Sequence, residues 1–258
     1  MAHHPSFITR HSSFVISLLP VLALSLVCGC SSSDDASMVN YLVDNDSISC
    51  QISAPVPESS LKQPFGEWLD ELLGGYYTGD AGDLEALVEF YGNAYADTLR
   101  ARFDDIPGTP KEYEATVEKA YETDDFVTYT LSTYFGIGGA HPTSGEYGVT
   151  FRKSDGRRIT WDIIRNDQLV AFNDLLREEL EGYFDVKNSS QLEKLLATDR
   201  VFDLPLPKTP PYFTEDGVAF VYQQYEIAAY AFGMPGNTIP YDRIEPLLTE
   251  WAKKILPK

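Results

Sequence analysis

His141 carries the most informative side-chain chemistry in the sequence, because it is the only histidine after residue 11. An imidazole ionises near neutral pH, so His141 is a candidate general base that Glu146 or a strand carboxylate would orient. The same histidine follows the glycines of GGA and precedes Pro142, which indicates a tight crossing in which the ring bonds a backbone group. No Gly-x-Ser-x-Gly elbow accompanies it, which favours the structural role and leaves enzymatic activity uncertain, leaning against it.

A second candidate site is the aromatic segment YEIAAYAFG at residues 225–233. Aromatic side chains on irregular backbone are good interface anchors, so this segment is a candidate partner-binding site. The alternative is that the rings plug the end of a sheet while the acidic residue satisfies buried backbone donors. The residues concerned are Tyr225, Glu226, Tyr230 and Phe232.

Cysteine and histidine are too scarce after residue 30 to build common inorganic sites. Cys50 is the only cysteine in that part of the chain, which excludes an intramolecular disulfide framework. One histidine and one cysteine do not make a tetrahedral zinc site without several carboxylates. We therefore expect no metal and no other cofactor.

The first thirty residues have the composition of an export signal, with Arg10 ahead of an apolar run that ends in VCGC. The ending resembles a bacterial lipobox, by which Cys30 would be lipidated and residues 1–30 would be a lipoprotein signal peptide. Residues 31–37 would be a flexible tether. An ordinary cleaved signal peptide is the alternative. We expect an exported chain in the cell envelope, anchored to a membrane by its N-terminal lipid.

The chain is strongly acidic, with 39 Asp and Glu against 20 Lys and Arg and a net charge of −19. Phosphates would be repelled by such a chain, so nucleic acid is not expected as a partner. The negative potential favours encounters with basic proteins. Acidity that serves only solubility is the alternative.

Hydrophobic periodicity predicts an α+β fold of two lobes, each an antiparallel sheet covered by helices, that share a continuous core. The N-terminal α+β lobe would span residues 38–141 and the C-terminal domain residues 142–258. Helical spacing is found at 58–73, 82–103, 167–184 and 192–196 and in a final helix at 244–255. Strand patterns are found at 39–43, 48–52, 113–120, 126–135, 147–152, 217–222 and 238–239.

Three pieces of the second half carry a family resemblance: GGAHP at 138–142, YGVTF through DGRRIT to DII at 147–164, and YFTEDGVAF through YEIAAYAFG to IPY at 212–241. In order and spacing they resemble the RsiV-like C-terminal domain family, formally a domain of unknown function. The resemblance covers roughly residues 134–255. That family occurs in the lysozyme-binding part of the anti-sigma factor RsiV and beside the peptidoglycan deacetylase domain of PdaC.

Departures from the family limit what the resemblance implies. Ala229 stands where proline is frequent, and a signal-like leader stands where RsiV has its sigma-binding segment, so sigma regulation is not carried over. A chain with one histidine after the leader also lacks the metal-binding histidines of the deacetylase. The expected function is a non-catalytic cell-envelope binding module for lysozyme or another cationic protein. The alternatives are peptidoglycan or carbohydrate binding and, less favoured, a hydrolase that uses His141.

Overall fold

The computed structural model describes residues 37–103, 111–138, 140–197 and 201–256. Residues 36–258 form one compact unit. The predicted signal peptide, its lipidation site Cys30 and residues 31–36 of the predicted tether lie outside the described residues. Every helix within the described residues is too short or too polar to cross a lipid bilayer.

The first sheet has five strands that lie side by side in chain order. They are β1 (Met38–Asp44), β2 (Ile48–Pro55), β3 (Lys111–Glu122), β4 (Phe126–Gly136) and β5 (Thr143–Arg152). β2 and β3 pair in parallel, so the prediction of a wholly antiparallel sheet is wrong at this pair. The physical reason is that a parallel pair requires a long crossover, here supplied by α1 (Lys62–Leu73) and α2 (Leu84–Phe103).

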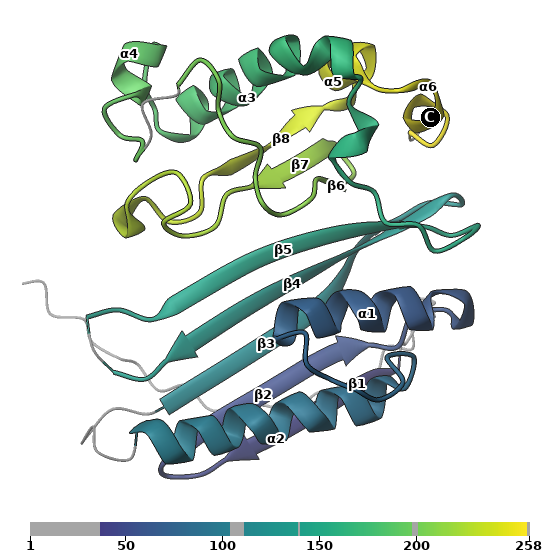
Figure 1. The fold of residues 1–258 in the computed structure, drawn as a ribbon, viewed down its shortest axis with the longest axis vertical. Coiled ribbons are helices and arrows are strands. Elements are labelled where there is room, and N and C mark those ends of the chain that lie inside the picture. Colours follow the sequence, from purple (N-terminus) through teal and green to yellow (C-terminus); the bar gives the residue numbers. More distant parts are fainter. Residues whose placement is uncertain (1–36, 104–110, 139, 198–200, 257–258) are drawn as a thin grey trace, which may run out of the picture. The chain divides into compact units, whose positions relative to one another are not determined.

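The two crossover helices cover one face of this sheet, as Figure 1 shows. Alternate strand residues point toward them, so Val127, Tyr129 and Leu131 of β4 are buried in one apolar cluster with Phe65 and Leu69 of α1. Phe65 packs edge-on against Tyr129, with 4.8 Å between ring centroids. This cluster is the core of the first lobe.

The second lobe, residues 159–256, contains a three-stranded antiparallel sheet. Its strands are β6 (Tyr212–Phe213), β7 (Gly217–Val221) and β8 (Gly236–Pro240), and its helices are α3 (Leu169–Tyr183), α4 (Ser189–Leu192), α5 (Tyr241–Ile244) and α6 (Glu250–Lys253). The continuous final helix predicted at 244–255 is wrong, because Pro246 lies in a 3-10 turn, Glu245–Leu247, that separates α5 from α6.

The α+β class is confirmed, with two sheets and covering helices. The expected continuous core is instead divided into two apolar clusters. Phe126 of β4 belongs to the second cluster, where its ring packs against Phe213 with 5.0 Å between centroids. A domain division between residues 141 and 142 would separate β5 from β4, although the two strands pair along their whole length.

A buried hydroxyl pair joins the second lobe to the open face of the first sheet. The hydroxyls of Thr128 and Thr150 lie 2.8 Å apart, and the backbone N–H of Phe213 donates to the Thr150 hydroxyl at 2.8 Å. Tyr212 lies against the same strand at Gly148, where a Cβ would stand 2.0 Å from the tyrosine ring. Gly148 therefore permits the close approach of β6 to β5.

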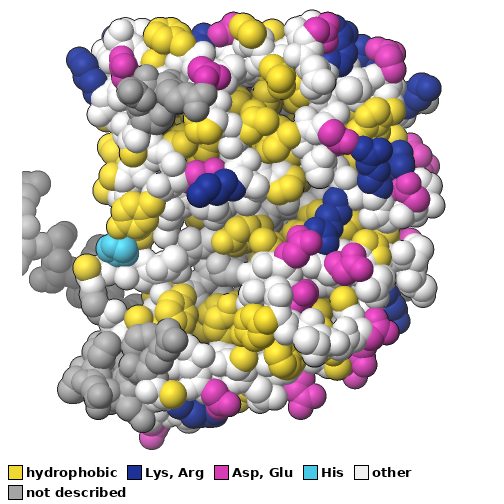
Figure 2. Space-filling view, in the orientation of Figure 1, with side chains coloured by type: hydrophobic (Ala, Val, Ile, Leu, Met, Phe, Trp, Pro, Cys, Tyr) yellow, Lys and Arg dark blue, Asp and Glu magenta, His cyan; other side chains and the backbone are white. Residues whose placement is uncertain are grey.

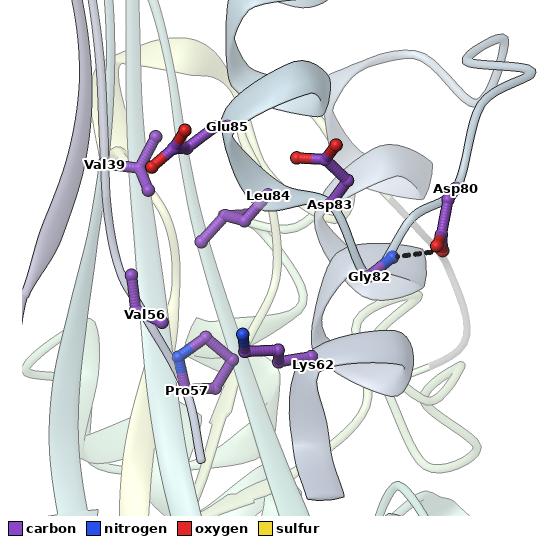
Figure 3. A pocket seen from close by; sticks show the side chains of 9 residues that line it. All are labelled: Val39, Val56, Pro57, Lys62, Asp80, Gly82, Asp83, Leu84 and Glu85. Atoms are coloured by element: carbon purple, nitrogen blue, oxygen red, sulfur yellow. Dashed lines mark hydrogen bonds between the residues drawn. The ribbon is translucent and has the colours of Figure 1, made fainter. Parts of the chain in front are cut away.

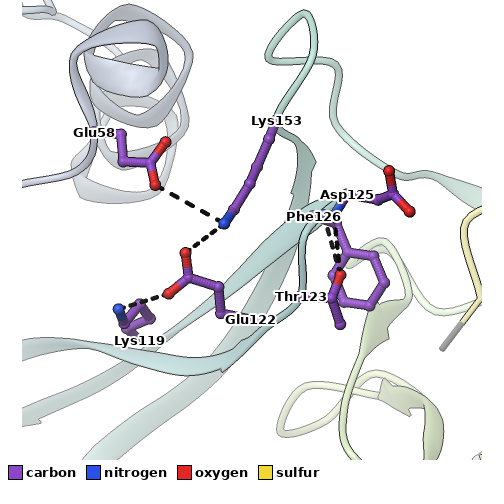
Figure 4. A network of polar contacts seen from close by, with 7 residues as sticks. All are labelled: Glu58, Lys119, Glu122, Thr123, Asp125, Phe126 and Lys153. Carbon is purple, nitrogen blue, oxygen red and sulfur yellow. Dashed lines mark hydrogen bonds and ion pairs between the residues drawn. The ribbon is translucent and has the colours of Figure 1, made fainter.

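Ion pairs at the far end of the sheet connect separate segments, as Figure 4 shows. The Lys153 amine contacts the Glu122 carboxylate at 2.5 Å and that of Glu58 at 3.8 Å, while Lys119 contacts Glu122 at 2.7 Å. Pairs at the surface each contribute at most about 1 kcal/mol, so this network orders the end of the sheet more than it stabilises the fold.

We predict that Thr150→Val lowers the free energy of unfolding by about 2 kcal/mol, because it leaves the buried Phe213 N–H without an acceptor. Thr130→Val, on the same face of the sheet but half-exposed, is the matched control and should cost less than about 0.5 kcal/mol. Urea denaturation measures both values. Equal effects of the two substitutions would contradict the role given to the Thr150 hydroxyl.

Burial raises the pKa of the Cys50 thiol from 9.0 to about 11. Between these two values the unfolded chain ionises the thiol while the folded chain keeps it neutral. The contribution of Cys50 to the free energy of unfolding is therefore fully present below pH 9.0 and is lost as the pH rises to about 11. Buried tyrosines such as Tyr91 and Tyr129 act in the same direction at higher pH, since burial raises their pKa to about 12. Cys50→Ala should reduce the fall in unfolding free energy across this window, and an unchanged fall would refute the assignment.

Candidate functional site

The chain between β7 and β8 forms the candidate segment, and hydrogen bonds inside the second lobe fix its start. The buried Tyr222 hydroxyl donates to the Pro205 carbonyl at 2.7 Å. Glu226 accepts the backbone N–H of Gln223 and that of Lys208, each at 2.8 Å. The Glu226 carboxylate is thus engaged with backbone donors, which is the structural role that the sequence left open.

Two glutamines attach this segment to the outer edge of β5. Gln224 accepts the N–H of Ser144 at 3.0 Å, and Gln223 accepts the N–H of Glu146 at 3.2 Å while its own amide donates to the Glu146 carbonyl. A carboxamide offers one donor and one acceptor in nearly the geometry of a peptide group, so it satisfies a strand edge as another strand would. The sequence analysis missed both glutamines, because a Gln-Gln pair has no pattern that predicts side-chain bonding to the edge of a strand.

The segment then places Tyr225 beside His141. The Tyr225 hydroxyl and the His141 Nε2 lie 3.1 Å apart, and the His141 ring stacks on Tyr230 with 3.7 Å between centroids and 20° between planes. The Tyr225 and Tyr230 centroids are 5.8 Å apart. We call His141, Tyr225 and Tyr230 the Tyr225 cluster. It joins residues 84 positions apart in the chain.

Tyr225 combines exposure with an unusual backbone conformation. Its side chain is 62% exposed, and its φ is +64°, in the left-handed region that bulky residues rarely adopt. Such conformations persist where the surrounding structure imposes them, and here bonds from Glu226 and the two glutamines hold the turn. The ring is therefore an exposed group on a constrained backbone.

His141 has no carboxylate partner within the described residues. Its Nδ1 lies 3.0 Å from the Pro142 carbonyl, which requires a proton on Nδ1 and leaves Nε2 of the neutral ring to accept from Tyr225. The hypothesis that Glu146 orients His141 is wrong, because the Glu146 carboxylate accepts from the Ser132 hydroxyl at 3.2 Å. In the described part of the chain, no group of three or more histidine, cysteine or acidic side chains is placed to hold a metal ion.

Phe232, predicted as part of the same site, belongs to a separate aromatic group. Its ring packs on Phe184 with 5.3 Å between centroids, and its carbonyl accepts from the Tyr183 hydroxyl at 2.7 Å. The structure thus brings Tyr225 and Tyr230 together with His141, and leaves Glu226 and Phe232 in other contacts.

Carboxylates line the open face of the first sheet near this segment. Glu112, Glu114 and Glu118 alternate along β3, so they share the face opposite the crossover helices. Strand pairing connects them to Glu146 through the row Thr116, Ser132, Glu146. We call these four glutamates the carboxylate face. Burial and, to a lesser degree, the charge of Glu118 raise the pKa of Glu146.

We predict that Tyr225→Gly is more stable than Tyr225→Ala by about 1 kcal/mol, because both lose the ring contacts but only glycine adopts the left-handed conformation without strain. Urea denaturation of the two variants gives the difference. An alanine variant as stable as the glycine variant would show that the backbone at Tyr225 is not strained.

Comparison with known proteins finds a family match within the second lobe. Residues 161–242 match the family described as "Protein of unknown function (DUF3298)". No curated protein sequence matches the chain.

Solved structures extend the similarity beyond those residues. A crystal structure of a DUF3298 family member from Bacteroides fragilis aligns with a TM-score of 0.61 at 21% identity, covering 84% of this chain and 93% of the other. A DUF3298 family protein from Pseudomonas aeruginosa aligns with a TM-score of 0.59 at 16% identity, covering 84% and 94%. At these identities the likeness concerns the fold alone. The chain therefore contains a DUF3298 family match at residues 161–242, within a fold similar to that of solved proteins of this family.

Proposed function

We propose that this protein is a cell-envelope module that binds a cationic protein, such as a lysozyme, without catalysing a reaction. The observation that carries the proposal is the Tyr225 ring, exposed on a constrained backbone and contacted by His141 and Tyr230. A ring held in place before binding loses little entropy when a partner covers it, which is the property of an interface hot spot. Supporting features are the carboxylate face and the net charge.

The charge distribution favours a basic partner. Glu114, Glu118 and Glu146 are exposed on one face of the sheet, and the whole chain has a net charge of −19. Figure 2 shows acidic side chains intermingled with lysine and arginine on the face that it draws, so local charge there is mixed. The carboxylate face is the surface that we propose attracts a basic partner.

Attachment to a membrane completes the proposal. Lipidation at Cys30 and a tether at residues 31–37 would hold the binding module at the surface of a membrane in the cell envelope. Support comes from the lipobox-like ending VCGC and the apolar run before it.

Peptidoglycan is the second candidate ligand, because sugars stack on exposed aromatic rings. Stacking along a glycan favours a flat platform, whereas the Tyr225 plane is tilted by 37° from that of Tyr230 and by 41° from that of His141. This geometry favours a protein partner, in which one ring fills one pocket.

We predict that residues 36–258 bind a basic lysozyme saturably in calorimetric titration at low salt. Because opposite charges steer the complex, affinity should fall between about 20 mM and about 150 mM salt. An equally basic unrelated protein serves as the control. Equal binding to both proteins, or binding to neither, would contradict the proposal and would assign the acidity to solubility alone.

We also predict that Tyr225→Ala weakens lysozyme binding by about tenfold or more, as expected for an interface anchor. Tyr76→Ala is the matched control, since Tyr76 is a comparably exposed tyrosine (52%) on the loop after α1. Calorimetric titration of both variants with lysozyme shows whether affinity depends on Tyr225 in particular or on exposed aromatic surface in general. Undiminished affinity of the Tyr225 variant would exclude the Tyr225 cluster from the interface.

A further inference from the structure

The outer edge of β1 has backbone groups without partners among the described residues. β1 pairs with β2 in antiparallel register, Met38 opposite Pro55 through Asp44 opposite Ser49. Hydrogen bonds flank the strand at both ends, from the Val56 N–H to the Ser37 carbonyl and from the Asn45 N–H to the Ile48 carbonyl. Because bonded and non-bonded positions alternate in an antiparallel pair, the odd-numbered residues of β1 bond to β2. The N–H and C=O groups of the even-numbered residues 38, 40, 42 and 44 therefore face outward.

The opposite edge of the same sheet, on β5, is hydrogen-bonded to other parts of the chain. On β5, residues 144 and 146 bond to the two glutamine side chains, and the backbone of residues 150 and 152 bonds to residues 159 and 157. An open strand edge is a template for pairing with another chain, and proteins commonly cover or block it. Among the described residues, the chain bonds much of the β5 edge with its own groups and leaves the β1 edge open.

A groove runs along the open edge, between β1 and α2. It has a volume of about 410 Å³ and is walled by residues 38–42 together with Glu85, Val88 and Glu89. A second hollow of about 340 Å³, whose lining Figure 3 draws, shares Val39 and Glu85 with it, so the two lie next to each other. Open backbone groups and a groove beside them are the two features of a site that binds an extended peptide as an added strand.

The side chains at the groove specify the chemistry of such a peptide. Glu85 and Glu89 line it on the α2 side, and no lysine or arginine lines the part beside β1. On the opposite face of the sheet, Leu42 and Met38 are 64% and 45% exposed. Successive residues of an added strand point to these two faces in turn. The matching sequence alternates basic residues, facing the glutamates, with apolar residues, facing Leu42 and Met38.

The length of β1 sets the length of the site. β1 is seven residues long, so an added strand of about seven residues spans it. The second hollow holds charges of both signs, since Figure 3 shows Lys62 together with Asp80 and Asp83 in its lining.

We propose that the β1 edge and its groove bind an extended basic polypeptide segment with alternating basic and apolar residues, which adds as a sixth strand. A second copy of this chain fits the edge less well, because pairing of two β1 strands would bring Glu85 and Glu89 of both copies together between chains of net charge −19. The site lies on other residues than the Tyr225 cluster, so it goes beyond the function proposed above.

The test uses residues 36–258, which form a compact unit, and a labelled heptapeptide, acetyl-Val-Lys-Val-Arg-Val-Lys-Val amide. Fluorescence anisotropy should show saturable binding. A peptide of the same sequence with N-methyl groups on alternate amides facing β1 should bind about tenfold more weakly, because it cannot donate to the edge. Equal affinity of the methylated peptide, or no binding by either peptide, overturns the proposal.

Protein variants locate the site. Leu42→Pro removes an outward N–H that β2 does not use, so it should leave the fold intact and weaken peptide binding by about tenfold, whereas Leu42→Thr, which keeps the N–H, should retain most of it. Glu85→Gln with Glu89→Gln should weaken binding and reduce its salt dependence. Circular dichroism verifies folding of each variant.

Two further outcomes complete the test. A dimer in light scattering that Leu42→Pro converts to monomer would assign the edge to a second copy and overturn the proposal. Lysozyme binding should be unchanged in Leu42→Pro, and a variant that loses lysozyme together with the peptide would show that the edge is not a separate site.

Discussion

The outer edge of β5 is the constraint on which the rest of the structure depends. Its N–H and C=O groups lie where the second lobe meets the first sheet, and backbone groups in such a place need partners. The Gln223 and Gln224 amides and the 157–159 backbone supply them. The Thr150 hydroxyl adds a bond to Phe213 from the same strand. The strand β5 of the first lobe is thus hydrogen-bonded to the second lobe at several points along its length.

The Tyr225 cluster is a consequence of this closure. Tyr225 directly follows Gln223 and Gln224, whose side chains bond to β5, and its φ is +64°. Its ring then meets His141, which precedes β5 on the first lobe. The histidine serves as a partner for two tyrosines, and its contacts explain why a lone imidazole occurs here without a carboxylate beside it. The residues proposed to bind a partner therefore also hold contacts between distant parts of the chain.

Local patterns predicted much of the fold, and contacts between distant residues explain what they missed. Helical spacing at 82–103 and 167–184 anticipated α2 and α3, because both helices bury one face. Parallel pairing of β2 with β3 and the engagement of Glu226 with Lys208 depend on chain segments far apart, which periodicity does not report. Pro246 was visible in the final helix, and its helix-breaking effect outweighed the apolar spacing around it. The aromatic composition indicated Tyr225 and Tyr230, but not their contact with His141.

The central claim is that, in the part of the chain that the structure describes, one edge of the five-stranded sheet is bonded by other segments and the opposite edge is open. Residue-resolved amide hydrogen exchange of residues 36–258, followed by NMR, tests it most directly. The account predicts slow exchange at Ser144, Glu146 and Arg152, whose N–H groups are bonded, and fast exchange at the outward N–H groups of Asn40 and Leu42. Protection of Asn40 and Leu42 equal to that of the β5 amides would contradict the claim.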